Sequence, residues 1–456
     1  GSKHPFSNYW TNQGGLPEVI GVLPSKEQAD ILVQKYFETV DAVYPIINKY
    51  QFLADYDRFW LLQPHEKHTA DPALLGLHFV VYAMGTQFIE LPSDQERKQV
   101  AEFYASAAHQ ALRISSYLNR GSFLTVQAIV LLCYFLMNDN KASDAWGFGG
   151  VLVRHVYAMG LNRDPEVVVP EATVAEKQQR RKLWQAVLFQ DTFLTVLLRL
   201  PPTTTFTDVA VDSLIDEPDV VASPSNVPTT SPPMNPMSIS SIAPSPSAMT
   251  TSSSTATPPP PITSNDTFYI RSMWRLANFV QPRICTPRAL GHPLASSPQD
   301  KINLVATFKA IFESLPPILT TADPVTFFQL AARNPRQARQ NLFLRSNYYH
   351  CLMLIQADES PRHGVSRDIQ GAIDAGRSGM LAFFNLWDHF FVDAGVWWVF
   401  QHRAFEEAVY ADPLFAQAKA DSVRALEILD HVGSSAPEMQ KTRTEVLRRA
   451  VENIRW

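Results

Sequence analysis

Cysteine is scarce in this sequence. Cys133, Cys285 and Cys351 are the three present among 456 residues, and no two of them form a CxxC pair. Three distant thiols build neither a disulfide framework nor a four-ligand zinc site, and their scarcity favours a reducing compartment. We therefore expect this stretch to contain no metal site and to bind no cofactor.

A surplus of basic residues is also lacking. Lys and Arg number 39 against 44 Asp and Glu, a formal net charge of -5. Proteins that bind DNA or RNA unaided usually carry a strong positive surplus, so we do not expect this stretch to hold nucleic acid by itself. The most apolar run, 123–137, contains Thr125 and Gln127 and falls short of the roughly 20 residues of a membrane span. No signal peptide opens the chain, so we expect a soluble intracellular protein without a membrane partner.

Catalytic motifs are absent as well. The glycines at 147–150 lack the third glycine of a nucleotide-binding loop, because Leu152 stands there, and the histidines at 65–68 are one residue too close for HExxH. Lone histidines such as His78 and His350 are interpreted as satisfied core or surface residues. The acidic cluster that an all-helical lyase needs for its metal is missing. We therefore predict no catalytic residues, and a protein that is not an enzyme.

One segment stands apart in composition. Ser, Pro and Thr dominate residues 217–266, which contain almost no aromatic or large branched side chains. Such a segment buries too little apolar surface to offset the entropy of ordering it, so we predict a disordered insertion. It separates a first helical half, 25–216, from a second, 267–456, which is expected to pack on the first. Residues 1–24 are interpreted as an N-terminal extension whose first two residues resemble the remnant of a cleaved tag.

Both halves show the helical periodicity of apolar residues. Ser122 is placed to cap a helix, Gly160 to end one and Pro201 to stop another. The pattern predicts helices near 25–40, 72–84, 122–136, 145–159, 176–200, 267–281, 301–315, 334–356, 366–388, 394–410, 413–432 and 437–454. No convincing run of alternating β-branched residues appears. The predicted fold class is therefore all-α, a single large multi-helical domain with a long disordered Ser/Pro/Thr-rich insertion.

Three segments occur in the order typical of one protein family. The first joins 36–40 (YFETV) to 44–47 (YPII) and Phe52. The second joins 125–128 (TVQA) to Ala145-Trp146, Arg154 and 159–164 (MGLNRD). The third contains 180–184 (RRKLW), Asp191 and 199–201 (RLP). Together they cover about residues 30–205 and resemble the middle homology region, the regulatory region, of fungal binuclear zinc-cluster transcription factors.

The resemblance implies a division of labour. DNA binding is expected from an upstream zinc cluster of six cysteines, which this stretch lacks, so zinc and DNA are expected partners of that missing domain alone. The middle region is expected to restrain or release transcription by RNA polymerase II in the nucleus. In some family members it responds to a small-molecule effector. Transcriptional co-regulators are further expected partners, and a homodimer is a further candidate assembly.

Four residues of the first half are candidates for an effector pocket or a regulatory core. Asp191 falls on the apolar stripe of the helix predicted at 176–200, and Arg154 flanks the apolar face of the preceding helix. Because a buried carboxylate needs a partner, we expect a structural ion pair between these two residues; the alternative is that an effector competes for the pair. Trp146 and Trp184 are expected to anchor the core, or else to line a pocket between helix layers.

Aromatic side chains are concentrated between residues 383 and 400. Phe384, Trp387, Trp397 and Trp398 are the candidates there for the effector pocket. A dense hydrophobic core is the plainer explanation of this composition, and a groove for a partner protein is the third.

The sequence thus predicts an effector-responsive regulatory domain of a fungal zinc-cluster transcription factor. The alternative is a helical scaffold of the same fold that dimerises or binds other proteins without a small-molecule effector. A saturable effector would separate the two.

Overall fold

The computed structural model describes residues 4–11, 13–91, 93–215, 266–410, 416–433 and 438–453. Within these ranges the regular structure is helical, apart from one isolated β-bridge between Ser360 and Val365. The predicted all-α class is confirmed. The predicted disordered insertion, apart from Asp266, lies outside the described residues.

Helices α1 to α9 make up the first half. Their bounds are α1 Leu16–Gly21, α2 Lys26–Val43, α3 Lys49–Leu61, α4 Pro72–Gln87, α5 Asp94–Ile114, α6 Phe123–Asn138, α7 Ala142–Ala158, α8 Pro165–Val168 and α9 Val174–Leu198.

Helices α10 to α20 make up the second half. Their bounds are α10 Thr267–Val280, α11 Thr286–Ala289, α12 Pro298–Glu313, α13 Pro317–Thr320, α14 Pro324–Arg333, α15 Pro335–Ala357, α16 Ile369–His389, α17 Phe391–Val396, α18 Trp398–Tyr410, α19 Ala416–Gly433 and α20 Glu438–Asn453. A π-helical turn, Gln281–Cys285, joins α10 to α11.

Polar side chains fix the starts of several helices. Ser25 and Ser122 cap α2 and α6 by accepting hydrogen bonds from backbone N–H groups three residues on, as the sequence predicted for Ser122. The start of α9 was predicted two residues late, because Thr173 caps it by accepting from the N–H of Glu176. Helices α3 and α5 were not predicted; the buried stripe of α5 consists mainly of alanines, which give a weak apolar signal.

Helices α4 and α6 form the centre of the first half, and both are buried along most of their length. Helix α4 packs on α2, α5 and α6. At Gly85 it approaches α2 so closely that a β-carbon there would collide with the carbonyl of Leu32. The absence of a side chain at Gly85 therefore sets the spacing of these two helices.

Helix α15 has the same central place in the second half, where it packs along α16 and also contacts α12, α13, α14 and α18. Two of its buried polar side chains pair across the core. Arg339 donates to Asp393 at 2.7 Å, and Asn347 accepts from Arg403 at 2.6 Å. These pairs compensate part of the cost of burying charge.

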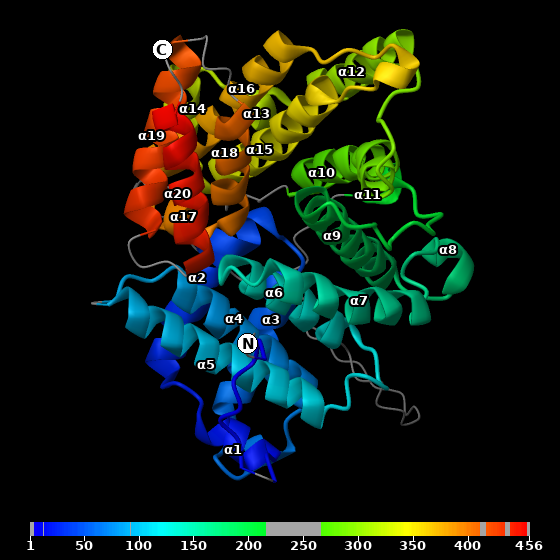
Figure 1. The fold of residues 1–456 in the computed structure, drawn as a ribbon. Helices are drawn as coiled ribbons and strands as arrows, with labels where there is room; N and C mark the ends of the chain where they lie inside the picture. Colours follow the sequence, from blue (N-terminus) through cyan, green and yellow to red (C-terminus); the bar gives the residue numbers. More distant parts are fainter. Residues whose placement is uncertain are drawn as a thin grey trace, which may run out of the picture.

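The two halves share one continuous hydrophobic core. Helix α15 packs on α2, α10 on α9 and α18 on α6, so that the green-to-red helices of the second half lie directly against the first half (Figure 1). The ring of Tyr44 stacks on that of Tyr134 with centroids 3.5 Å apart. Two further rings, Phe343 and Trp397, contact Tyr44 from the second half, with centroids 5.7 and 5.6 Å away.

A charged hub also joins the halves. Arg336 at the start of α15 donates to Asp41 of α2 at 2.8 Å and to Asp266 before α10 at 2.6 Å. Burial raises the pKa of Asp41, and the neighbouring guanidinium opposes that rise. The hub thus holds the entrance to the second half against the end of α2.

The two histidines singled out in the sequence differ. His350 is buried but partnered, between Glu406 and Glu407 at 3.3 Å each. His78 is fully buried among the rings of Phe52, Tyr56 and Phe59, and neither ring nitrogen has a hydrogen-bond partner in the described ranges. The prediction that His78 is satisfied is therefore wrong. Burial lowers the pKa of His78 to about 3, so it stays neutral.

Membrane-spanning helices and metal-binding clusters are absent from the described ranges. Among those residues no helix combines the length and apolarity needed to cross a membrane. His, Cys, Asp and Glu side chains there form no group of three or more that could hold a metal ion.

Candidate functional site

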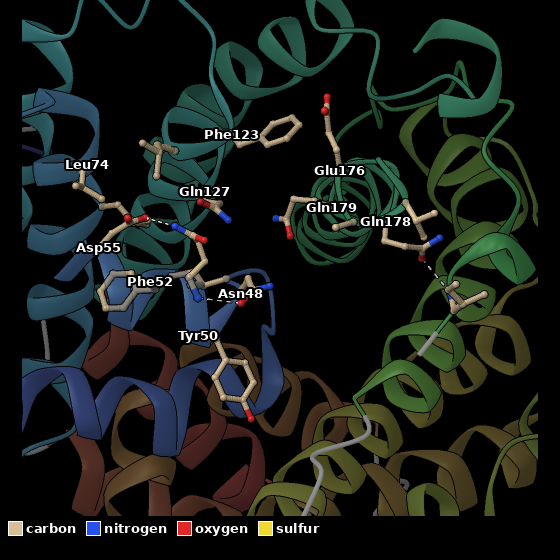
Figure 2. A pocket seen from close by; sticks show the side chains of 17 residues that line it. Asn48, Tyr50, Phe52, Asp55, Leu74, Phe123, Gln127, Glu176, Gln178 and Gln179 are labelled. Atoms are coloured by element: carbon tan, nitrogen blue, oxygen red, sulfur yellow. Dashed lines mark hydrogen bonds between the residues drawn. The ribbon is translucent and has the colours of Figure 1, made fainter. Parts of the chain in front are cut away.

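A cleft of about 760 Å³ opens in the first half between α3, α4, α6 and the start of α9. Its size suits a small organic ligand. Figure 2 shows side chains converging on it from these helices. The lining residues are Ile47, Asn48, Tyr50, Gln51, Phe52, Asp55, Leu74, Leu77, Phe123, Leu124, Gln127, Val174, Ala175, Glu176, Gln178, Gln179 and Ile215.

The segment between α2 and α3 forms one edge of the cleft. It contains Pro45, which cannot donate a backbone hydrogen bond, and ends at Asn48, which caps α3 by accepting from the N–H of Gln51 at 3.1 Å. The carbonyl of Ile46 accepts from Nε2 of Gln127 at 3.2 Å and from Nε2 of Gln179 at 3.4 Å. Two side chains from α6 and α9 thus satisfy one backbone carbonyl of a linker.

Gln127 and Gln179 point toward one another across the cleft (Figure 2). The Nε2 of each glutamine donates to the carbonyl of Ile46. Within the described residues, neither Oε1 accepts a hydrogen bond. An amide oxygen accepts two hydrogen bonds. Gln127 as a whole is 7% exposed and forms part of the cleft wall.

Gln178 holds the neighbouring wall. Its Nε2 donates to the carbonyl of Ser213 at 3.1 Å, and its Oε1 accepts from the N–H of Ile215 at 3.0 Å. The same segment is held from α10, where Nε of Arg271 donates to the carbonyl of Leu214 at 2.6 Å. The side chain of Ile215 therefore lines the cleft from a segment fixed on both sides.

Apolar side chains supply most of the wall. Phe52 and Leu77 are buried, and Phe123 and Leu124 from the first turn of α6 are half-buried. The guanidinium of Arg180 lies over the Phe123 ring, 5.6 Å from its centroid. This contact lies within the range of cation–π attraction and steadies the ring at the mouth of the cleft.

The two carboxylates of the lining have protein partners already. Asp55 accepts from Nε2 of Gln51 at 2.8 Å and from Arg58 at 3.1 Å, and Glu176 accepts from Arg180 at 3.4 Å. None of the described lining residues is Lys, Arg or His. The cleft is therefore apolar and amide-lined, with little unbalanced charge.

None of the eight residues that the sequence singled out lines this cleft. Trp184 is completely buried, 6.0 Å from the ring of Tyr157, and anchors the core. Trp146 is half-buried against the same core. Both positions agree with the structural role expected of these tryptophans.

The expected ion pair between Asp191 and Arg154 does not form. Arg154 is exposed, and Asp191 is half-buried and accepts from the backbone N–H groups of Thr203 and Thr204 at 2.7 and 2.8 Å. The two threonine hydroxyls also donate to it, at 3.2 and 2.8 Å. The loop after α9 turns back and supplies these donors, so the carboxylate fixes a loop and needs no cation.

Among the described residues, the aromatic candidates of the second half line none of the three clefts of ligand size, of about 760, 520 and 410 Å³. Trp397 and Phe384 are buried in the core, and Trp387 packs on Phe391 with centroids 4.5 Å apart. Trp398 is buried, and its Nε1 donates to Asn140 at 2.9 Å. A neighbouring void beside Val399 has a volume of about 10 Å³, too small for a ligand. Dense packing explains this stretch.

The family segments indicated the position of the cleft better than the charged and aromatic candidate residues did. The first segment contributes Ile47 and Phe52 to the cleft, and the second contributes Gln127. A glutamine in the second turn of a mostly apolar helix is the feature that marks the site, because a buried amide needs a partner across the packing interface.

Comparison with known proteins gives a match over the same part of the chain. Residues 33–255 match the family described as "Fungal specific transcription factor domain". The match begins within α2 and covers α3 to α9, and so includes the cleft. The family is one of transcription regulators and not a class of enzymes.

Three curated relatives show the extent of the likeness. The equisetin cluster transcription factor eqxF of Fusarium heterosporum is 25% identical over 198 residues, 40% of this chain and 28% of the relative. The fusarisetin A cluster transcription factor fsa6 of a Fusarium species is 25% identical over 198 residues, 40% of this chain and 26% of the relative. The Zn(2)-C6 fungal-type transcription factor mpsB of Macrophomina phaseolina is 29% identical over 194 residues, 40% of this chain and 25% of the relative.

In each comparison the match spans about a quarter of the relative's length. The likeness therefore concerns one region of those longer proteins. Residues 33–255 of this chain are thus similar to the fungal specific transcription factor domain and to part of the Zn(2)-C6 fungal-type transcription factors.

Proposed function

We propose that this chain is the effector-responsive regulatory part of a fungal zinc-cluster transcription factor. It acts in the nucleus on transcription by RNA polymerase II. DNA contact and zinc belong to a zinc-cluster domain outside this stretch, and these residues bind no cofactor and catalyse no reaction. The family match and the relatives' names support the transcriptional role.

The cleft between α3, α4, α6 and α9 is the proposed effector site. One observation carries this assignment: the family's own segments converge there, with Gln127 and Ile46 joined by a hydrogen bond and Ile47 and Phe52 in the wall. Structural needs alone account for a closed interface between these segments. They do not account for about 760 Å³ of open space lined by amides.

The effector is expected to act through α9. This helix contributes Gln178 and Gln179 to the cleft, and it also contacts α10 of the second half. A ligand that bridges α6 and α9 stabilises one arrangement of these helices, and co-regulators that bind the surface respond to that arrangement.

A thermal-shift screen of neutral small molecules against the whole chain tests the effector site. A ligand of the cleft raises the melting temperature of the wild type, because binding to the folded state alone stabilises it. The rise should vanish in Ala175→Trp, which fills the cleft from the start of α9, and persist in Ala332→Trp, an exposed position on α14. Equal shifts in both variants contradict the site.

The alternative, a helical scaffold without a small-molecule effector, predicts that no ligand binds in the cleft. If the helical body mainly dimerises, sedimentation shows a concentration-dependent dimer and no compound shifts the melting temperature through the cleft. A homodimer that forms alongside effector binding is compatible with the proposal.

A further inference from the structure

The chemistry of the cleft narrows the class of its ligand, and this step rests on the proposed effector site. We infer that the cleft takes an uncharged, mainly apolar molecule that donates hydrogen bonds, through O–H or N–H groups, to Oε1 of Gln127 and Oε1 of Gln179.

The hydrogen bonds that the two glutamines already make indicate which polar groups the ligand should carry. Both place their Nε2 on the carbonyl of Ile46, at 3.2 and 3.4 Å, and this shared contact fixes the orientation of the two amides. Each retains an acceptor that no described residue fills. A ligand that fills the cleft displaces water from these acceptors, and an acceptor that is then left without a donor costs free energy. A ligand with O–H or N–H groups at this point avoids that cost, whereas a ligand that brings only acceptors incurs it.

The charge of the ligand follows from the lining. An anion finds no Lys, Arg or His among the described lining residues. Arg180, at the mouth, already donates to Glu176 at 3.4 Å and to the carbonyl of Met159 at 3.1 Å. A cation would have to compete with Arg58 for Asp55. Because moving an unpaired charge out of water is costly, the neutral form of a ligand is favoured.

The apolar part of the ligand has its own wall. Phe52, Leu77, Phe123 and Leu124 line the cleft together with the amides, and the rings of Phe52 and Phe123 are labelled in Figure 2. Burial of apolar surface there supplies most of the binding free energy, at about 25 cal/mol per Å², and the paired amides orient the polar end.

Three matched probes test this class. Bisphenol A is apolar with two O–H donors, and its phenols stay protonated at neutral pH because a phenolic pKa lies near 10. Its dimethyl ether lacks the donors, and diphenolic acid adds a carboxylate. Each probe is titrated against the intact chain with the uncharged dye Nile red bound. The fall in dye fluorescence measures how far the probe displaces the dye. Bisphenol A should displace the dye at a concentration about threefold to tenfold below that of the dimethyl ether, and diphenolic acid should be weaker than bisphenol A.

Variants assign the preference to the two amides. In Gln127→Leu and in Gln179→Leu, the displacing concentrations of bisphenol A and its dimethyl ether should become more alike. In Gln370→Leu, a change at an exposed glutamine of α16, the two concentrations should differ as they do in the wild type. Gln179 is half-buried, so its variant reports even where Gln127→Leu unfolds the chain. A wild-type chain that binds the ether as well as the bisphenol, or prefers the acid, overturns the inference and leaves the cleft in place. Nile red binding that Ala175→Trp does not reduce overturns the cleft itself.

Discussion

Gln127 and Gln179 donate to the same carbonyl oxygen, that of Ile46, from two different helices. The three residues belong to segments far apart in the chain, and their meeting point is the edge of the cleft. One backbone carbonyl therefore orients both amides. This shared contact joins the helix packing of the first half to the chemistry of the proposed effector site.

Asp191 should contribute to stability through the loop after α9. Asp191→Ala removes the acceptor of Thr203 and Thr204 and should lower the free energy of unfolding by about 2 kcal/mol, because two backbone N–H groups lose their partner. Asp191→Asn retains one oxygen and should cost less. Urea titration measures both, with the exposed Asp57→Ala as control. If Asp57→Ala lowered the free energy of unfolding as much as Asp191→Ala does, the loop contact would have no special role in stability.

The Arg336 hub should stabilise the contact between the halves. In Arg336→Met the carboxylate of Asp41, which is 4% exposed, loses its cation, and the free energy of unfolding should fall by about 2 to 4 kcal/mol. Arg333→Met, at an exposed position of the preceding helix, should have no such effect. The double variant Arg336→Met with Asp41→Asn should recover part of the loss, since it removes the unpaired charge. Failure of that recovery would show that the hub acts by packing and not by charge.

His78 should make the fold sensitive to acid. Its folded pKa of about 3 lies below the value near 6.5 of an unfolded chain. As the pH falls below 6.5 the unfolded state therefore takes up a proton that the folded state does not. The contribution of His78 is intact above that pH and is lost progressively as the pH falls toward 3.

The variant His78→Phe removes this dependence while keeping an aromatic ring among Phe52, Tyr56 and Phe59. Between pH 7 and pH 5 the wild type should lose about 2 kcal/mol more stability than the variant. Chemical denaturation at the two pH values gives this difference, with His65→Phe, an exposed position, as control. Equal losses in the wild type and His78→Phe would mean that His78 is solvated or partnered in solution.

Two glycines of the first half should respond in opposite directions to alanine. Gly85→Ala places a β-carbon against the carbonyl of Leu32 and should destabilise the fold by about 1 to 3 kcal/mol, because α2 and α4 must move apart. Gly147→Ala, in α7 with open space around it, should stabilise the fold by about 0.5 to 1 kcal/mol through helix propensity. Thermal unfolding of both variants tests the pair, and a stabilising Gly85→Ala would contradict the close crossing.

The fold class followed from apolar periodicity, and helix ends followed from caps such as Ser122. The candidate site did not follow in the same way. Asp191 was paired with Arg154 because helix faces can be derived from periodicity, whereas the loop carrying Thr203 cannot be placed by it. The aromatic residues near 383–400 indicated a pocket by composition, but packing density depends on how the second half meets Tyr44 and Tyr134 of the first.

The cleft was hidden for a related reason. Its walls come from α3, α4, α6 and α9, and α3 was not predicted. Gln127 was recognised as part of a family segment, yet its partner Ile46 lies on the linker before α3 and is found only once the helices are packed. An amide within an apolar helix is therefore best interpreted as one end of a tertiary contact whose other end the sequence does not name.

Transcriptional output tests the central claim most directly. The intact chain is fused to an unrelated DNA-binding domain, and reporter expression is compared between wild type, Ala175→Trp and Ala332→Trp in cells that express equal amounts. If occupancy of the cleft governs regulation, the cleft-filling Ala175→Trp should change reporter output by at least about fivefold, and Ala332→Trp should match the wild type. Identical output from all three, with Ala175→Trp folded to the same melting temperature, would contradict the account.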